Sequence, residues 1–272
     1  MEPGSPRHSV VDMATNPSIR APRRRPNGSA DPVGRSRRPL TAIRALLAGT
    51  VVAVVVAGIL IGVSVAGSGS GSSSKPLAGA EFTSLLLSGI PQHGTVLGKP
   101  GAPVRLVEYG DLQCPICRAF AVDTLPTIVR DYVRTGSVQI EFRGLAFIGP
   151  DSEKALRAVN AAAAQNRAWN LLDLLYVNQG RENSGWVTDS LIQSAATHVD
   201  GLDVSKLFAA RSSAATDARI RTAAAQARRD MGGQLQTPTF EVGRAGQPLQ
   251  LLQITSLDVS QFTPALDRLL GR

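Results

Sequence analysis

Two cysteines, Cys114 and Cys117, are the residues of this chain whose type and spacing best support chemistry. They are its only cysteines, and Pro115 and Ile116 lie between them, which makes a CxxC motif. A thiol pair at this spacing can alternate between a dithiol and a disulfide, and it can exchange disulfides with another protein. The motif therefore points to a redox pair in which both cysteines are catalytic.

The sequence around the motif predicts a strand that leads into a helix. An alternating, β-branched run at 104–109 precedes the cysteines, and an apolar pattern at helical spacing follows them over 120–133. Unpaired N–H groups and the helix dipole favour an anion at a helix N-terminus. We therefore expect Cys114 to have a lowered pKa and to attack, and Cys117, one turn further on, to resolve.

Three other interpretations of the cysteines compete with the redox one. A structural disulfide of this spacing would close a small loop and restrict the unfolded chain little. A zinc site would need two more ligands, and the chain offers no second CxxC and only three histidines, which are His8, His93 and His198. Two unlinked core cysteines are the third. The order of strand, CxxC and helix favours the redox pair, which needs no metal or organic cofactor.

The positive charge of the chain is concentrated near its N-terminus. The formal net charge is +8, and residues 1–44 alone carry nine Arg and three acidic residues. The rest of the chain is nearly neutral, which argues against a nucleic-acid-binding function for the folded part. Residues 1–44 contain hardly an apolar run, and we expect a disordered, Arg-rich cytoplasmic tail.

An apolar stretch at 45–66 predicts a transmembrane anchor. Its 22 uncharged residues would form a helix of about 33 Å, which matches a hydrocarbon core of roughly 30 Å. Four arginines lie just before it, so the positive-inside rule predicts a single-pass protein of the cell membrane with its catalytic domain outside. A signal peptide cleaved after Ala66 is the alternative, although such peptides usually have an apolar core of about 7–15 residues.

The remaining elements alternate between strands and helices. Residues 67–90 are expected to form a Gly/Ser tether and a short amphipathic lead-in. A brief strand at 95–97, the strand before the CxxC, a helix kinked at Pro126 and a strand at 137–143 follow. Four or five helices are predicted over 151–232, with a core that includes Trp169, Leu172, Leu175 and Tyr176 and a solvated face that includes Arg219, Arg221, Arg228 and Arg229. A hairpin at 239–253 and a helix at 260–270 end the chain.

Two segments of the chain resemble a known family. The sequence Val-Glu-Tyr-Gly-Asp-Leu-Gln-Cys-Pro-Ile-Cys-Arg-Ala-Phe at 107–120, together with Thr-Pro-Thr-Phe at 237–240, is similar to the DsbA-type thiol:disulfide oxidoreductases of the thioredoxin superfamily. The similarity covers about 91–272. It implies one α/β domain with a thioredoxin-like fold and a helical insertion between the CxxC half and the cis-proline half.

The resemblance also implies roles for three residues outside the CxxC. Pro238 corresponds to a cis-proline that faces the cysteines, and Thr237 would offer backbone groups to a substrate peptide. Glu108 matches a buried carboxylate that assists proton transfer near the resolving cysteine. From its position in the strand alone, Glu108 could instead be an exposed residue.

The resemblance implies thiol–disulfide exchange on client proteins outside the membrane. A disulfide oxidase, reoxidised by a membrane redox partner, is the first interpretation. A reductase or isomerase function is the second interpretation, and two residues support it. The strongest oxidants of the family carry His at the position of Ile116. Thr237 resembles the residue found before the cis-proline in the isomerase and some reductase branches. A non-catalytic peptide-binding module of the same fold is the third interpretation.

Overall fold

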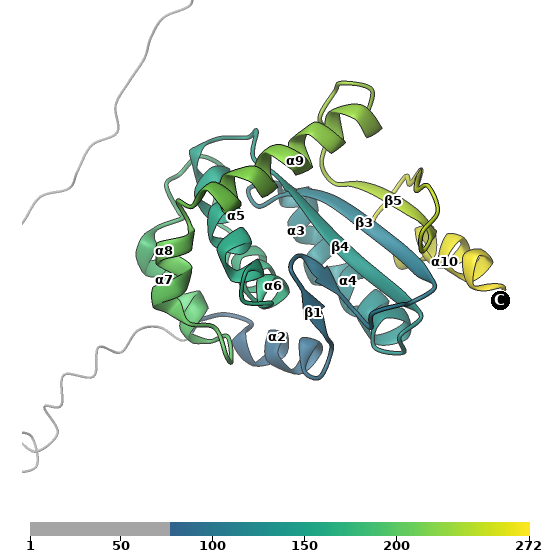
Figure 1. Cartoon of the computed structure of the whole chain (residues 1–272), viewed down its shortest axis with the longest axis horizontal. Helices are drawn as coiled ribbons and strands as arrows, with labels where there is room; N and C mark the ends of the chain where they lie inside the picture. Colours follow the sequence, from purple (N-terminus) through teal and green to yellow (C-terminus); the bar gives the residue numbers. More distant parts are fainter. Residues whose placement is uncertain (1–76) are drawn as a thin grey trace, which may run out of the picture. The chain divides into compact units, whose positions relative to one another are not determined.

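A mixed six-stranded sheet runs through the residues that the computed structural model describes, which are 77–272 (Figure 1). The strand order is β1-β2-β4-β3-β5-β6, and only β3 and β4 pair in parallel. The strands are β1 Gln92–His93, β2 Val96–Leu97, β3 Val104–Asp111, β4 Val138–Leu145, β5 Thr239–Arg244 and β6 Gln250–Leu251. The predicted strands are all present, and β1 is an addition that is too short to show a periodicity in the sequence.

Strand β3 lies in the middle of the sheet and is buried on both faces. Leu106 belongs to the main hydrophobic core, whereas Val107 and Tyr109 belong to a smaller cluster. Because successive side chains of a strand point to opposite faces, Glu108 shares the face of Leu106. A central strand therefore delivers two polar side chains, Glu108 and Tyr109, to opposite sides of the sheet.

The helix that follows the CxxC is divided into four short pieces. They are α3 Pro115–Ala119, a π-helical turn at Phe120–Thr124, α4 Leu125–Ile128 and a second π-helical turn at Val129–Val133. Pro126 lies in the first turn of α4, where a missing N–H is tolerated. The irregularity predicted at this proline takes the form of π-helical turns on either side of α4. The apolar residues predicted to face inward are buried: Phe120, Ala121, Leu125, Ile128, Val129 and Val133.

Five helices form the insertion between β4 and β5, as the sequence predicted. They are α5 Pro150–Ala163, α6 Ala168–Val177, α7 Asp189–Thr197, α8 Val204–Ala210 and α9 Ala214–Asp230. The expected core residues of α6, among them Trp169 and Tyr176, are buried. Helices α5 to α8 gather at one end of the sheet (Figure 1), and α9 packs on a face of the central strands β3 and β4 through Ala227.

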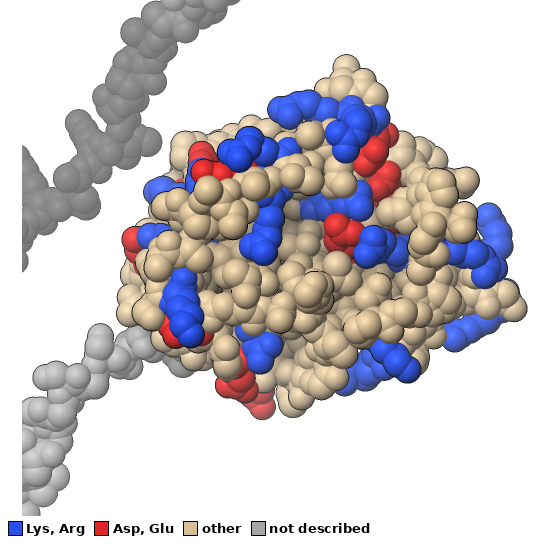
Figure 2. Space-filling view, in the orientation of Figure 1, with Lys and Arg blue, Asp and Glu red and all other residues tan. Residues whose placement is uncertain are grey.

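Helix α9 carries the predicted solvated arginines. Arg219, Arg221, Arg228 and Arg229 are all exposed. Figure 2 shows Lys and Arg side chains gathered along the edge of the molecule that α9 forms. Only two of the 17 residues of α9, Thr216 and Ala227, are buried. The helix therefore has little apolar contact with the domain.

The C-terminal elements close the core behind the CxxC helix. Strands β5 and β6 form the predicted hairpin, and a 3₁₀ turn at Val259–Gln261 leads to α10 Thr263–Leu270. The rings of Phe120, Phe240 and Phe262 meet, with centroid separations of 4.6, 5.4 and 4.9 Å. This aromatic cluster packs the CxxC helix against β5, the strand that follows the Thr-Pro-Thr-Phe segment.

The compact unit begins before Pro91. Helix α2, Ala80–Leu87, packs on α6, and the Thr83 hydroxyl donates a 2.5 Å hydrogen bond to Asp173. The helix is thus part of the domain, although the sequence placed it in a lead-in. The predicted tail at 1–44 and the predicted span at 45–66 lie outside the described residues. Within residues 77–272, no helix is long and apolar enough to cross a membrane.

Candidate active site at the CxxC motif

Cys114 is the N-cap residue of α3, directly after the loop that leaves β3. Its N–H donates to the Asp111 carbonyl over 3.0 Å, and Pro115 occupies the first turn of the helix, where its fixed φ fits. The Cys117 N–H donates to Cys114 Sγ over 3.4 Å. The sulfur of Cys114 therefore takes the place that a capping oxygen takes in other helices, as its position in the sequence predicted.

The two thiols differ in burial and in acidity. Both are free in this structure, with Cys114 6% exposed and Cys117 fully buried. Hydrogen bonds from Cys117 lower the pKa of Cys114 to about 6, although burial opposes the shift. Burial raises the pKa of Cys117 well above its usual value. At neutral pH the site therefore holds a thiolate at Cys114 and a thiol at Cys117.

The segment that contains Pro238 lies against Cys114. The Thr237–Pro238 bond is cis, as predicted, and the Cys114 thiol lies 3.5 Å from the Thr237 carbonyl oxygen. Pro238 also lines a hollow of about 250 Å³ together with residues of β6, among them Leu251. The structure thus brings Cys114, Thr237 and Pro238 to one place, although more than 120 residues separate them in the sequence.

Glu108 is buried on the same side of the sheet as the cysteines. It is 1% exposed, and among the described residues its Oε1 has no hydrogen-bond partner. Burial, assisted by the negative charge of Cys114, raises the pKa of Glu108 to about 8. The charge of Glu108 in turn raises the pKa of Cys117. The alternative that Glu108 is an exposed strand residue is therefore wrong.

Gly110 leaves the space that Glu108 occupies. A Cβ at this position would lie 2.9 Å from Glu108 Oε1 and 2.9 Å from the Tyr176 hydroxyl. Such separations are too short for a carbon atom, so a larger residue would displace one of these groups. Tyr176, which the sequence suggested only as a core residue, also donates to the Asp111 carbonyl over 3.4 Å.

Several polar side chains that the sequence analysis did not single out hold the loop before Cys114. The Asp111 carboxylate accepts N–H groups from Gln113, Phe147 and Ile148. Gln179 Nε2 donates to the carbonyls of Leu112 and Cys114. Asp111 and Gln113 could have been noticed because they adjoin the motif. Gln179 could not, because it lies after α6 and no local pattern marks it.

Comparison with known proteins places the chain in a family. A family model described as thioredoxin matches residues 92–247. The chain belongs to the thioredoxin family. Its sequence is 39% identical over 100 residues to the probable disulfide bond formation protein D of Bacillus cereus, which covers 36% of this chain and 46% of that protein. With the disulfide bond formation protein D of Bacillus subtilis, identity is 34% over 103 residues, 37% of this chain and 46% of that protein. The matched part thus spans about half the length of these relatives.

Solved structures support the thioredoxin-like fold. Oxidised BdbD from Bacillus subtilis superposes with a TM-score of 0.56 at 24% identity, over 67% of this chain and 98% of that one. The α-DsbA1 protein of Wolbachia pipientis gives a TM-score of 0.55 at 20% identity, over 70% and 96% of the two chains. The predicted α/β fold with a helical insertion between the CxxC half and the cis-proline half is confirmed.

The difference in acidity between the two thiols predicts their order of reaction. In the reduced protein, alkylation of Cys114 should reach half its maximal rate near pH 6, whereas Cys117 should react only in strongly alkaline solution. Iodoacetamide labelling across pH, read by peptide mass spectrometry, measures both. A Cys114→Ser variant is the control, since its remaining thiol should stay slow. Faster labelling of Cys117 at mildly acidic pH would reverse the two roles.

Proposed function

We propose that this protein catalyses thiol–disulfide exchange and acts as a disulfide oxidase on client proteins outside the cytoplasm. The observation that carries the proposal is the Cys114 thiolate at the N-terminus of α3, beside the cis-proline segment, with Cys117 buried behind it. The Bacillus relatives are named disulfide bond formation proteins, which supports the oxidase function.

The exchange proceeds in two steps from the oxidised Cys114–Cys117 pair. A client thiolate attacks Cys114 Sγ, the sulfur–sulfur bond breaks, and Cys117 leaves with the electron pair. A second client thiolate then attacks the client sulfur of the mixed disulfide, and Cys114 leaves as its stabilised thiolate. The client loses two electrons and gains a disulfide, while the pair is reduced to the dithiol.

Glu108 is suited to manage the proton of Cys117. A buried thiolate at Cys117 is costly, as its raised pKa shows, so this leaving group needs a proton. Glu108, with a pKa of about 8, is mostly protonated at neutral pH and can supply that proton. In the reverse direction its carboxylate accepts the proton and prepares Cys117 to attack.

The surface around Cys114 suits an extended, partly apolar client segment. Ile116, between the cysteines, is 54% exposed, and the hollow next to Pro238 is lined in part by Phe240, Leu251 and Ile254. The backbone of Thr237 lies next to the reactive sulfur and can pair with a client backbone. These contacts fit unfolded or extended segments that contain cysteine.

The same site could run in the opposite direction as a reductase or isomerase, and the reduction potential decides between them. A low pKa at Cys114 stabilises the dithiol and makes the disulfide more oxidising. Potentials of this superfamily run from about −120 mV for strong oxidants to about −270 mV for thioredoxin. A reduction potential of about −120 mV supports the oxidase, and one of about −270 mV supports a reductase.

We also propose that the domain faces the cell exterior on a single-pass membrane anchor. The support is the uncharged stretch at 45–66 with arginines before it, which the positive-inside rule orients. An oxidase in this place needs an electron acceptor after each turnover, and a membrane redox partner would supply one.

Loss of the resolving cysteine should trap the mixed disulfide. When the exchange runs in reverse, the Cys114 thiolate attacks a client disulfide and Cys117 resolves the mixed disulfide. Cys117→Ser retains the attacking thiol and lacks the resolving one, so disulfide-linked complexes should accumulate. Cys114→Ser should give none, and wild type should give few. Non-reducing gels of cells that produce each variant, followed by reduction, measure the complexes. Equal yields from both serine variants would favour the non-catalytic peptide-binding module.

Removal of the Glu108 carboxyl should slow the step that involves Cys117 and spare the attack by Cys114. In Glu108→Gln, reduction of a model peptide disulfide should form the mixed disulfide at the wild-type rate and release it roughly tenfold or more slowly. Rapid acid quench and mass spectrometry separate the two steps. Asp123→Asn, which removes an exposed carboxylate from the helix that follows the CxxC, is the control. Equal slowing of both steps would contradict a role in proton transfer.

The orientation of the anchor can be measured directly. A reporter that is active only outside the cytoplasm, fused after Arg272, should be active, and the same reporter placed after Arg44 should be silent. A cytoplasm-only reporter should give the opposite pair of results. Activity of that second reporter after Arg272 would overturn the proposed localisation.

A further inference from the structure

The segment at 231–238 joins α9 to β5 and ends with the Thr237–Pro238 pair beside Cys114. It contains no helix or strand of its own. Apart from Leu235, which packs against the cluster that contains Val107 and Tyr109, its position relative to Cys114 depends on how its two ends are held. The β5 end is fixed by pairing with β3, in which Thr239 lies opposite Tyr109. The other end is Asp230, the last residue of α9.

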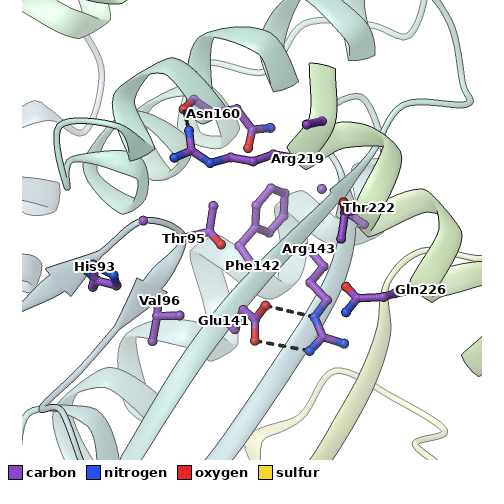
Figure 3. Close-up of a pocket in the computed structure, with 14 residues that line it drawn as sticks. His93, Thr95, Val96, Glu141, Phe142, Arg143, Asn160, Arg219, Thr222 and Gln226 are labelled. Carbon is purple, nitrogen blue, oxygen red and sulfur yellow. Dashed lines mark hydrogen bonds and ion pairs between the residues drawn. The ribbon is translucent and has the colours of Figure 1, made fainter. Parts of the chain in front are cut away.

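Apolar packing between α9 and the sheet is confined to the last turns of the helix, around Ala227. A cavity of about 460 Å³ lies between α9 and the strands β2 and β4, so much of the helix does not touch the sheet (Figure 3). Thr222 and Gln226 line it from the helix, and Glu141 and Arg143 line it from β4. Near its end, Ala227 packs in the small cluster with Val107, Tyr109 and Leu145, and polar contacts at Asp230 add to this packing.

Those contacts come from Tyr109 and Arg143, on the face of the sheet opposite Glu108. The Tyr109 hydroxyl donates to Asp230 Oδ2 over 2.5 Å, and Arg143 Nη1 donates to that hydroxyl over 2.7 Å. Arg143 also pairs with Glu241 Oε2 at 3.3 Å. Its guanidinium is oriented by two hydrogen bonds to Glu141, drawn as dashed lines in Figure 3.

The hydrogen-bonded group of Tyr109, Arg143, Asp230 and Glu241, called the node below, joins both ends of the segment that presents the cis-proline. Asp230 comes immediately before the segment, and Glu241 comes three residues after Pro238. Tyr109 is fully buried, and charge-assisted hydrogen bonds in a buried site are stronger than neutral ones. Loss of the hydroxyl would leave Asp230 with only its 3.9 Å ion pair to Arg143, so the α9 end would be held less firmly while the β5 end stayed in its ladder.

We propose that Tyr109 and Arg143 are positioning residues for the thiol chemistry. Through Asp230 and Glu241 they fix where Thr237 and Pro238 stand relative to Cys114. Two properties should depend on them: the fit of a client segment against Thr237, which rests on the proposed function, and the acidity of Cys114, which does not. After Cys117, the Thr237 side chain is among the groups that lower the pKa of Cys114.

Tyr109→Phe tests the proposal because it removes one oxygen atom and leaves the buried ring. The chain offers a matched control in Tyr132→Phe, since the Tyr132 hydroxyl donates to Asp267 over 3.0 Å, between the CxxC helix and α10. Each change removes a Tyr–Asp hydrogen bond, and both should lower thermal stability by similar amounts. Only the first bond lies at the end of the cis-proline segment.

We expect Tyr109→Phe to raise KM for a cysteine-containing peptide about two- to tenfold, the loss typical of one hydrogen bond, with a smaller change in kcat. The pKa of Cys114, followed by thiolate absorbance of the reduced protein, should rise toward its ordinary value. Asp230→Asn, at a half-buried helix end, should reproduce both effects, and the double variant should add little. Tyr132→Phe should leave KM and the pKa unchanged.

Equal behaviour of Tyr109→Phe and Tyr132→Phe in both readouts would overturn the proposal and leave the node with a purely structural role. The two proposals can fail separately. If the wild-type protein exchanges no disulfides with any peptide, the proposed function fails. The pKa of Cys114 needs no client and still reports whether Tyr109 positions the segment.

Discussion

The negative charge of the Cys114 thiolate is the constraint on which the arrangement of this site depends. A charge in a mostly buried place needs hydrogen bonds, and Cys114 obtains them from the first turn of α3 and from Cys117. Burial, together with the Coulomb cost of a second anion near Cys114, raises the pKa of Glu108 to about 8. Between about pH 6 and pH 8 the reduced site therefore holds one negative charge, on Cys114.

The pKa shifts act on stability in opposite directions. The folded-state pKa of Cys114 is lowered, so its ionisation stabilises the reduced fold at alkaline pH, and this contribution is lost as pH falls through about 6. The pKa of Glu108 is raised, so its stabilising contribution is complete below its ordinary value of 4.5 and is lost as pH rises through about 8. In the disulfide form the thiolate contribution is absent while the Glu108 carboxyl remains buried. The low pKa of Cys114 therefore stabilises the reduced form relative to the disulfide at neutral pH, in the direction that makes a disulfide more oxidising.

The sequence allowed the local part of this arrangement to be predicted, because the strand, the CxxC and the helix are adjacent in the chain. Their order alone indicated the cap position of Cys114. Glu108 and Pro238 required the family resemblance, since neither burial nor a cis bond leaves a mark in the local pattern. Gln179 and Asp230 could not be found at all, because each acts on the site across 65 or more residues of sequence. The packing of α2 was missed for the same reason, since its Thr83 contacts Asp173, 90 residues away.

Strand β3 connects the two functions of the fold. Its period of two residues sends Glu108 toward the cysteines and Tyr109 toward α9. In the two proposals, these adjacent residues therefore act on the proton of Cys117 and on the position of the cis-proline segment. Both neighbours of β3 are paired along its length, which prevents a shift of register that would exchange these two faces. A buried central strand is therefore required here for more than stability. It connects the thiol pair and the cis-proline segment to one rigid element.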